Sequence, residues 1–288
     1  MTLATERDAD TVQRRARAVR IPRARPVCIL HVAFCITCLL TTACGARRIS
    51  LPTDPGAPLP NFTDIHTKLS SSCRGARTLT AELGLSGRAG NQRLRGRLLA
   101  GFERPASMRL EGVAPFGQPV FILASRTDAA VLLLPRDERV VTGEPPAAIL
   151  GALTGVALAP ADLQALLTGC VVPEPKALAG RMHANGWASI ELGGGATLYL
   201  ERDGEWQVRA AQRDRWQVEY PAWQGAFPQT IRLASSSADV DVDLTATMSQ
   251  IEVNVDLDPS AFSVSVPPGA RPLSLDELRN AGPLGEKP

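Results

Sequence analysis

The segment EPPAAILGALTGVALAPADLQALLTGC, residues 144–170, carries only two charged side chains, Glu144 and Asp162, in a chain with 31 basic and 29 acidic residues. Apolar residues recur in it at helical spacing, first after a pair of prolines and again after Pro160. Proline suits the first turn of a helix, where its missing N–H has no partner, and a glycine such as Gly169 commonly ends one. The segment therefore predicts two short helices, with apolar positions at Ile149, Leu150, Leu153 and Val156 and then at Leu163, Leu166, Leu167 and Cys170.

Neither of these helices has a polar face. A helix that is apolar most of the way round must be buried. The apolar run from Ala147 to Ala159 is also shorter than the roughly 20 residues that span a bilayer. We therefore expect both helices to lie inside the protein, enclosed by the segments that flank them.

The flanking segments alternate apolar and polar residues, as strands do, and turn signals such as Asp203-Gly204 separate them. They run from residue 79 to 142 before the helices and from 188 to 255 after them. The pattern predicts about 11 strands. Glycines within several strands allow strong bending. The predicted fold class is mainly β (α+β): a single curved antiparallel sheet that forms a half barrel, with short helices plugging its concave face.

A half barrel plugged by helices leaves room for an apolar ligand, whereas a small closed barrel fills its own middle. The apolar positions of the strands and helices are the candidates for the lining of this hollow. They are Leu83, Leu85, Leu94, Leu98, Met108, Leu110, Ile122, Ile149, Leu150, Leu153, Leu163, Leu166 and Leu167.

Two further helices are expected at the ends of the domain. Phe62, Ile65, Leu69 and Cys73 form one apolar stripe at helical spacing. Near the C-terminus, Ser274 and Glu277 have the spacing of a capping box for a short helix. The chain then divides into a signal peptide (1–43), a lipidated cysteine with a flexible tether (44–60), the half barrel (61–266) and a C-terminal extension with a short helix (267–288).

The first 43 residues have the features of a secretory signal. Met1–Pro26 carries seven arginines and no lysine, and Val27–Ala43 is apolar. A retained membrane anchor is the alternative, but it would need a longer apolar core. Seven of the 31 basic and three of the 29 acidic residues precede Cys44, which leaves 24 basic and 26 acidic residues. The mature chain thus gives no electrostatic case for binding nucleic acid.

Export would also decide the redox environment of the cysteines. Cys73 and Cys170 are the two that remain after Cys44, and an even pair in an oxidising compartment predicts a disulfide. Two buried thiols are the alternative.

The sequence offers little for catalysis, and we expect no enzyme, no metal and no cofactor. His66 and His183 are the only histidines after the signal, and we expect both to be solvated. No cluster of cysteine, histidine and carboxylate has the spacing of metal ligands. Asp239, Asp241 and Asp243 alternate along one strand, so a solvated sheet edge is expected rather than a calcium loop.

Two motifs carry resemblances to known proteins. The segment LLTTACG around Cys44 resembles a bacterial lipobox, whose cysteine is acylated and becomes the mature N-terminus; Gly45 after it favours the outer membrane over the inner. The segment VAPFGQP, residues 113–119, lies between two expected strands. Its prolines and glycine fix a rigid bend that pushes the Phe116 side chain outward.

From Phe62 to Val255 the chain resembles the LolA/LolB lipoprotein-localisation family, in particular its outer-membrane receptors of the LolB type. The matching segments, in order, are MRL at 108–110, APFG at 114–117, ILGALTG at 149–155, LQALLTG at 163–169 and WQVEY at 216–220. The resemblance implies a half barrel that holds lipoprotein acyl chains, receives them from a periplasmic LolA-like carrier and inserts them into the outer-membrane bilayer. The insertion loop would be Pro115, Phe116 and Gly117, with Phe116 where the family usually has leucine.

The first hypothesis is therefore a monomeric, non-enzymatic lipoprotein receptor, anchored through Cys44 in the outer membrane and facing the periplasm. A lipid or glycolipid carrier, or a sensor or assembly subunit of the same fold, is the alternative. If Cys44 is not acylated, the protein is expected to be soluble in the periplasm. The segment from Leu257 to Pro288 extends beyond the family pattern.

Overall fold

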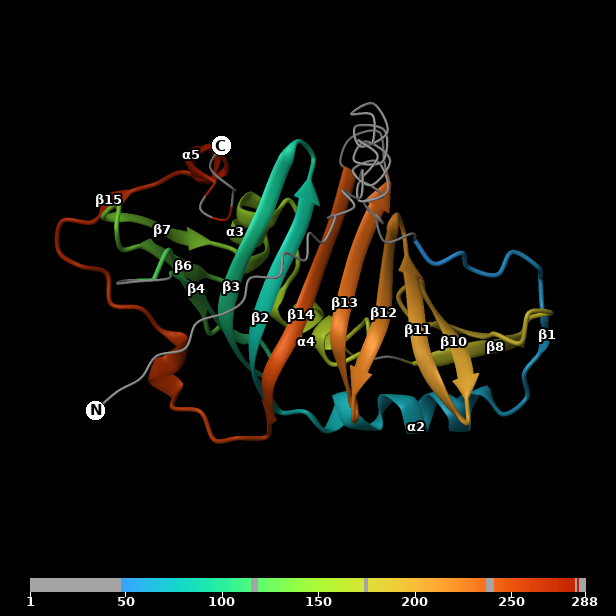
Figure 1. The fold of residues 1–288 in the computed structure, drawn as a ribbon. Helices are drawn as coiled ribbons and strands as arrows, with labels where there is room; N and C mark the ends of the chain where they lie inside the picture. Colours follow the sequence, from blue (N-terminus) through green and yellow to red (C-terminus); the bar gives the residue numbers. More distant parts are fainter. Residues whose placement is uncertain (1–47, 115–118, 174–175, 237–240, 283, 285–288) are drawn as a thin grey trace, which may run out of the picture. The chain divides into compact units, whose positions relative to one another are not determined.

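One open sheet of fifteen strands forms the frame of the protein, in the order β1-β8-β9-β10-β11-β12-β13-β14-β2-β3-β4-β5-β6-β7-β15 (Figure 1). The computed structural model describes residues 48–114, 119–173, 176–236, 241–282 and 284, and the chain from Ile49 onward forms one unit. Neighbouring strands are antiparallel except β7 and β15, which are parallel.

The strands are β1 (Ala57–Pro58), β2 (Thr78–Ala89), β3 (Gln92–Glu103), β4 (Ser107–Val113), β5 (Ile122–Ser125), β6 (Ala130–Leu134), β7 (Arg139–Glu144), β8 (Ala177–Met182), β9 (Ala188–Leu192), β10 (Ala196–Asp203), β11 (Glu205–Arg213), β12 (Trp216–Gln224), β13 (Phe227–Ser236), β14 (Asp241–Val253) and β15 (Arg271–Pro272). The helices are α2 (Phe62–Gly75), α3 (Pro146–Thr154), α4 (Pro160–Leu167) and α5 (Leu275–Ala281), with a 3-10 turn, η1 (Pro259–Phe262).

The predicted class, mainly β with one curved open sheet, is confirmed, but the expected count of about 11 strands is wrong. The strands β1 and β15 have only two residues each and give no alternating pattern. The third that sequence reasoning missed, β8, reads ALAGRM and also lacks alternation. It packs against α2, where a Cβ at Gly180 would lie 2.2 Å from the Cβ of Phe62.

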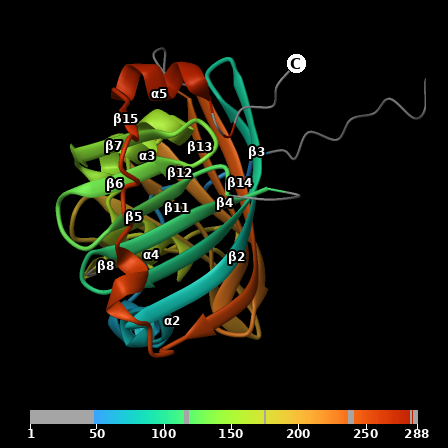
Figure 2. The same cartoon turned by 90° about the vertical axis from the view of Figure 1, so that its left-hand side faces the viewer.

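Both apolar helices lie where the sequence places them. The helices α3 and α4 begin with proline in the first turn, and Gly155 ends α3 in the left-handed conformation, with φ of 76°. Figure 2 shows the sheet curving around them. Their leucines and isoleucine are buried except Leu163, which is half-buried. The concave face of the sheet and these two helices therefore form the main core.

Helix α2 runs along one end of the strands β8 to β12 (Figure 1). Its last turn is joined to the end of α4 by a disulfide between Cys73 and Cys170, whose Cα atoms are 6.0 Å apart. Both cysteines are buried, together with Ala165. The disulfide therefore ties α4, on the concave face, to the helix at the end of the sheet.

The C-terminal extension forms a strap, defined as residues 271–282 and 284. Its backbone pairs with β7, where the Leu273 N–H donates to the Val140 carbonyl oxygen at 2.8 Å. Its other end reaches β3, where the Arg95 N–H donates to the Leu284 carbonyl oxygen at 3.1 Å. Between them, α5 packs against α3 and buries Leu278 completely. The strap thus begins as the edge strand β15 beside β7 and reaches β3, past the strands β6, β5 and β4.

The segment expected as a flexible tether is docked from Ile49 onward. The Ile49 N–H donates to Glu219 Oε1 at 2.8 Å, and its carbonyl oxygen accepts from Gln217 at 3.0 Å. Further along, the Asp54 carbonyl oxygen lies 3.2 Å from His183 Nδ1. These contacts hold the segment that precedes β1 against the outside of the domain.

Candidate functional site

An apolar cavity of about 120 Å³ lies between the concave face of the sheet and the helices α3 and α4. Leu83 and Leu85 on β2, Leu98 on β3 and Leu110 on β4 form one wall. The neighbouring strands β13 and β14 continue this wall with Ile231, Leu233, Leu244 and Ala246. The helices and the chain between them close it with Leu150, Thr154, Val156, Leu158, Leu163, Leu166 and Leu167.

Sheet register brings the strand residues into rows. Ile231 pairs with Ala246, which pairs in turn with Leu85. Leu83 pairs with Leu98 on its other side. Because side chains alternate between faces along a strand, these residues all point to the concave side.

The single polar residue of the lining needs no partner from a ligand. The Thr154 hydroxyl donates to the Leu150 carbonyl oxygen at 2.8 Å, within α3. The cavity therefore offers only hydrocarbon to whatever enters it, and it excludes ligands that bring polar groups inside.

The structure brings together eight of the thirteen lining residues expected from sequence. They are Leu83, Leu85, Leu98, Leu110, Leu150, Leu163, Leu166 and Leu167. Leu94, Met108, Ile149 and Leu153 are buried in the core outside the cavity. Ile122 is on the other face of the sheet, because it pairs with Glu111 while Leu123 pairs with Leu110. The run Phe121-Ile122-Leu123-Ala124 is apolar throughout, so its pattern could not show which residues face inward.

Seven lining residues were missed by sequence reasoning. They are Thr154, Val156, Leu158, Ile231, Leu233, Leu244 and Ala246. The alternation of Ile231 with Leu233, and of Leu244 with Ala246, was present in strands already identified. What was absent was the register that places these strands opposite α4.

The end of α4 is fixed at two points. The Tyr220 hydroxyl, wholly buried, donates to the Leu166 carbonyl oxygen at 3.2 Å. Burial raises the pKa of Tyr220, so the hydroxyl stays a donor. The disulfide at Cys170 is the second point. No disulfide within the described residues holds α3, which rests against the strap instead.

The size of the cavity limits what it holds as it stands. An engineered apolar cavity of about 150 Å³ takes up benzene. A cavity of about 120 Å³ therefore accepts a few methylene groups, and the three acyl chains of a lipoprotein require α3 or α4 to move. The apolar hollow expected from sequence is present but small, because the leucines of the two helices occupy most of the space beneath the sheet.

Both histidines are buried, so the expectation that they are solvated is wrong. His183 lies 2.9 Å from the Ser189 hydroxyl and 3.4 Å from Asp54. His66 is in α2 with its exposed fraction at 4%. Burial lowers the pKa of His66, and the charge on Arg74 lowers it further. Within the parts of the chain that are described, no three histidine, cysteine or carboxylate side chains gather as metal ligands would.

The acidic residues of β14 are not on a sheet edge, because this strand lies between β13 and β2. Asp243 accepts two hydrogen bonds of 2.7 Å from the Arg232 guanidinium. Glu219, also buried, lies 3.5 Å from the same guanidinium. Asp243 is therefore part of an ion-pair network on the convex face; Asp239 lies outside the described residues.

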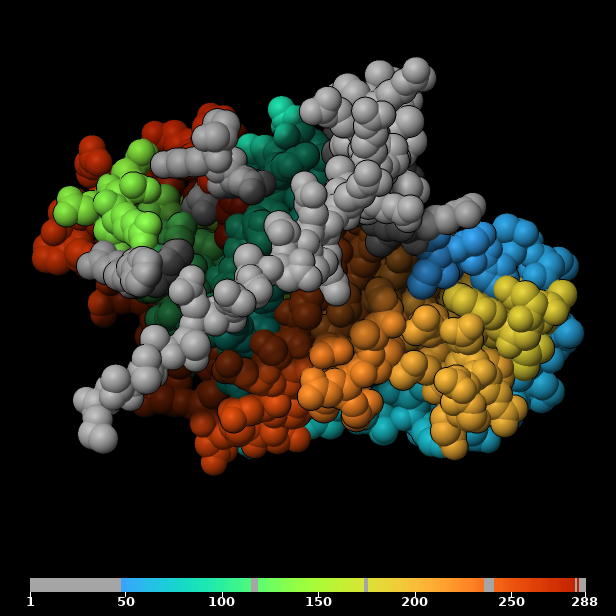
Figure 3. All heavy atoms as spheres, in the orientation of Figure 1, coloured from blue at the N-terminus to red at the C-terminus, as the bar shows by residue number. Residues whose placement is uncertain are grey.

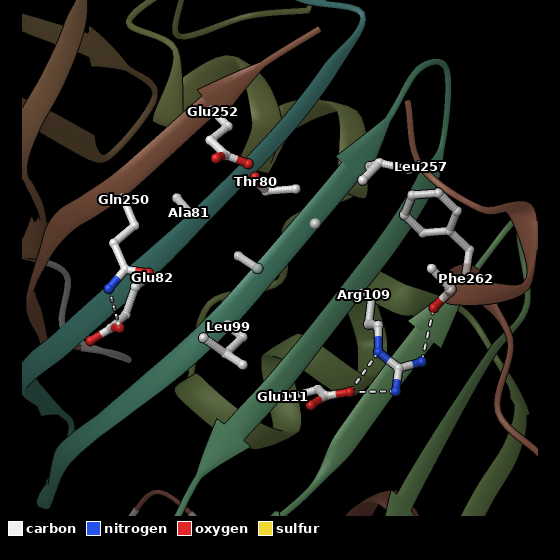
Figure 4. Close-up of a pocket in the computed structure, with 13 residues that line it drawn as sticks. Thr80, Ala81, Glu82, Leu99, Arg109, Glu111, Gln250, Glu252, Leu257 and Phe262 are labelled. Atoms are coloured by element: carbon white, nitrogen blue, oxygen red, sulfur yellow. Dashed lines mark hydrogen bonds and ion pairs between the residues drawn. The ribbon is translucent and has the colours of Figure 1, made fainter. Parts of the chain in front are cut away.

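A second hollow, of about 390 Å³, lies on the convex face between β2, β3, β4 and η1 (Figure 4). Its floor includes Leu99, whose exposed fraction is 46%. The carboxylates Glu82, Glu111 and Glu252 line it, and Arg109 donates to Glu111 and to the Ala261 carbonyl oxygen. An alkyl chain here would take carboxylates out of water at a cost in free energy. The cavity on the concave face is thus the better candidate for an apolar ligand.

The expected lipid attachment at Cys44 and the expected insertion loop at Pro115, Phe116 and Gly117 lie outside the described residues. In the part that is described, every helix is too short or too polar to cross a bilayer.

No protein-family model and no curated protein sequence matches the chain. Solved structures do resemble it. A LolA superfamily protein from Nitrosomonas europaea is 10% identical, over 69% of this chain and 98% of that one, with a TM-score of 0.47. A domain described as outer membrane lipoprotein-sorting, from Vibrio parahaemolyticus, is 11% identical over 69% and 94%, with a TM-score of 0.43. A DUF1329 family protein from Desulfovibrio piger is 12% identical over 72% and 97%, with a TM-score of 0.41. At these identities and TM-scores none of the three assigns a function to the chain.

Proposed function

We propose that this protein binds the alkyl chains of lipids or lipoproteins between its curved sheet and the helices α3 and α4, without covalent chemistry. The observation that carries the proposal is the cavity, because fourteen of its fifteen lining residues are apolar and the hydroxyl of the other, Thr154, is already hydrogen-bonded. Each methylene group that leaves water for such a site contributes about 0.8 kcal/mol.

Longer chains would enter by displacement of α3. This helix is apolar, short and held by packing, whereas α4 is held by the disulfide and by Tyr220. Alkyl chains would then take the place of the leucine side chains of the helices. The core therefore stays filled both with and without ligand.

A substitution that fills the cavity tests the proposal. Ala246 lines the cavity, and the next residue, Thr247, is exposed on the opposite face of the same strand. We expect Ala246→Phe to weaken binding of palmitate, measured by calorimetry on the mature protein, by about tenfold or more, equal to the loss of about two buried methylenes. The matched control Thr247→Phe should bind as the unchanged protein does. Equal affinity in all three proteins would overturn the proposal.

We further propose, from the lipobox and the LolB-type segments, that Cys44 carries a lipid anchor in the outer membrane. The protein would receive lipoprotein cargo from a LolA-like carrier, and Phe116 would dip into the bilayer to give the cargo a path out. Mass spectrometry of the mature N-terminus tests the anchor. An unmodified N-terminus, or a chain that still includes residues 1–43, would remove it.

A further inference from the structure

A groove of about 590 Å³ separates α2 from the β10–β11 hairpin and the β12–β13 turn, and we call it the α2 groove. It lies at the lower edge of the domain in Figure 3, where the gold atoms of the hairpin meet the cyan atoms of α2. Its floor is apolar, with Ile65 and Leu69 from α2 and Val208 from β11. Two indole rings, of Trp206 and Trp223, complete it.

Both tryptophans are fixed by neighbours in the sheet. The Trp223 indole N–H donates to the Val208 carbonyl oxygen at 3.1 Å. The Arg202 guanidinium stacks over the Trp206 ring, 5.7 Å from its centroid. Because these neighbours already restrict both indole rings, a ligand that contacts them loses little further side-chain entropy. The C–H face of a sugar ring, which carries a partial positive charge, is complementary to the electron-rich face of an indole ring.

The rim of the groove is polar but has no net charge. Its four charged residues are Asp64, Lys68, Arg202 and Glu205, two of each sign. Lys68 and Glu205 form an ion pair of 2.6 Å across the groove, from the helix to the hairpin. The hydrogen bond from Lys68, and then its charge, lower the pKa of Glu205, which favours its carboxylate form.

The equal numbers of acidic and basic side chains on the rim limit the class of ligand that the groove can bind. A phosphate or sulfate group would need an excess of basic side chains, which the rim lacks. Uncharged hydroxyl groups instead suit a mixture of carboxylates, ammonium and planar amides, because each hydroxyl both donates and accepts. The amide side chains of Asn61 and Gln207 line the groove as well.

The groove lies beside the segment that follows α4. Gly169, just beyond α4, is so close to Trp223 that a Cβ there would lie 2.6 Å from the indole Cη2. Leu166 and Leu167, one turn earlier, line the cavity. The alkyl chain of a ligand would therefore lie in the cavity, and its head would lie beside the end of α4, in the α2 groove.

We propose that the α2 groove binds the uncharged sugar head of an amphipathic ligand whose alkyl chain occupies the cavity. The inference rests on the proposed function for the alkyl part, but the groove itself takes the sugar through Trp206, Trp223 and the polar rim.

The test compares two detergents with the same alkyl chain, dodecyl maltoside and dodecylphosphocholine, each titrated below its micelle concentration into the mature protein. We expect the maltoside to bind at least fivefold more tightly. Trp206→Ala should abolish this preference. The matched control is Trp216→Ala, because Trp216 also lies under an arginine, at 5.6 Å from Arg215, but does not line the groove. It should leave the preference unchanged.

Saturation-transfer NMR with maltose alone separates the groove from the cavity. Maltose contacts that are present in the unchanged protein and disappear in Trp206→Ala support the groove. They do so even if no alkyl chain binds the protein; the absence of alkyl binding would contradict only the proposed function. Equal affinity for the two detergents, or a preference that survives Trp206→Ala, overturns the sugar site and leaves the alkyl cavity standing. Should Trp206→Ala fail to fold by circular dichroism, Gln207→Ala on the same rim replaces it, with the same expected loss of preference.

Discussion

The Tyr220 hydroxyl donates a hydrogen bond of 3.2 Å to the Leu166 carbonyl oxygen, and so links the sheet to the last turn of α4 inside the apolar core. Leu166 lines the cavity, while Tyr220 is wholly buried beneath it. The link holds a wall of the candidate site in place without adding a polar group to the cavity surface.

Removal of this hydroxyl should loosen α4. Tyr220→Phe keeps the ring and its contact with Trp223, 5.6 Å between centroids. The Leu166 carbonyl oxygen would still accept from the Gly169 N–H at 3.2 Å. We therefore expect a loss of only about 1 kcal/mol in the free energy of unfolding, measured in urea. A loss above about 3 kcal/mol would indicate that the ring has moved.

The disulfide closes a loop between residues 97 positions apart. In the chain-entropy model such a loop contributes about 4 to 5 kcal/mol by restricting the unfolded chain. We expect dithiothreitol to lower the free energy of unfolding by up to this amount. The double variant Cys73→Ala, Cys170→Ala should start from the lower value and not respond to the reductant. An unchanged denaturation curve for the unmodified protein would contradict the prediction.

The strap should loosen in acid because of Glu277. Its carboxylate accepts from the Ser274 N–H at 2.9 Å and from Arg139 at 2.8 Å. The hydrogen bond from the Ser274 backbone, then that from Arg139, lowers the pKa of Glu277 to about 2 from its usual 4.5. A depressed pKa in the folded state means that the stabilisation is complete above pH 4.5 and is lost as the pH falls towards 2.

Hydrogen exchange at the α5 amides, corrected for the intrinsic rate, measures this effect. Protection should fall between about pH 4.5 and pH 2 in the unmodified protein. Glu277→Gln retains the capping geometry without a titrating group, so its protection should be lower at neutral pH and flat across the same window. A parallel fall in both proteins would assign the loosening to another group.

The buried arginine of the convex face should be far more important to stability than an exposed one. The Arg232 side chain is 9% exposed and contacts two carboxylates. Arg232→Met leaves Glu219 buried without its cation, which costs about 3 to 5 kcal/mol. Arg88→Met breaks an ion pair with Asp241 whose side chains are more than half exposed, and should cost less than about 1 kcal/mol. Similar losses in chemical denaturation would contradict this ranking.

The insertion loop yields a prediction that concerns transfer alone. Phe116→Glu places a charge where the proposed function needs contact with lipid, so we expect normal folding and normal palmitate binding but no delivery of lipoprotein to liposomes. Phe116→Leu should transfer as the unmodified protein does. Normal transfer by Phe116→Glu would refute the role of the loop.

The sequence by itself determined the kinds of element and the partners of some residues. The apolar residues around Ile149 and those around Leu166 each recur at helical spacing and leave no polar face. Both helices therefore had to be buried wherever the sheet lay. The capping box at Ser274 and Glu277 formed as expected, because a capping motif involves residues within one turn. Cys73 and Cys170 are the two cysteines that follow Cys44, so the sequence after it offered one pairing, and the structure joins them.

Only the tertiary structure decided which faces meet and how much space remains between them. Ile122 was assigned to the cavity and lies on the other face, because an apolar strand shows no alternation and register alone sets its orientation. The His183 ring lies against the Asp54 carbonyl oxygen, 129 positions away in sequence, and Asp243 pairs with Arg232 on the neighbouring strand; no local pattern shows either contact. The volume of the cavity depends on how closely the leucines of α4 approach Leu244 and Ala246, and such packing between distant segments leaves no periodic signal in the chain.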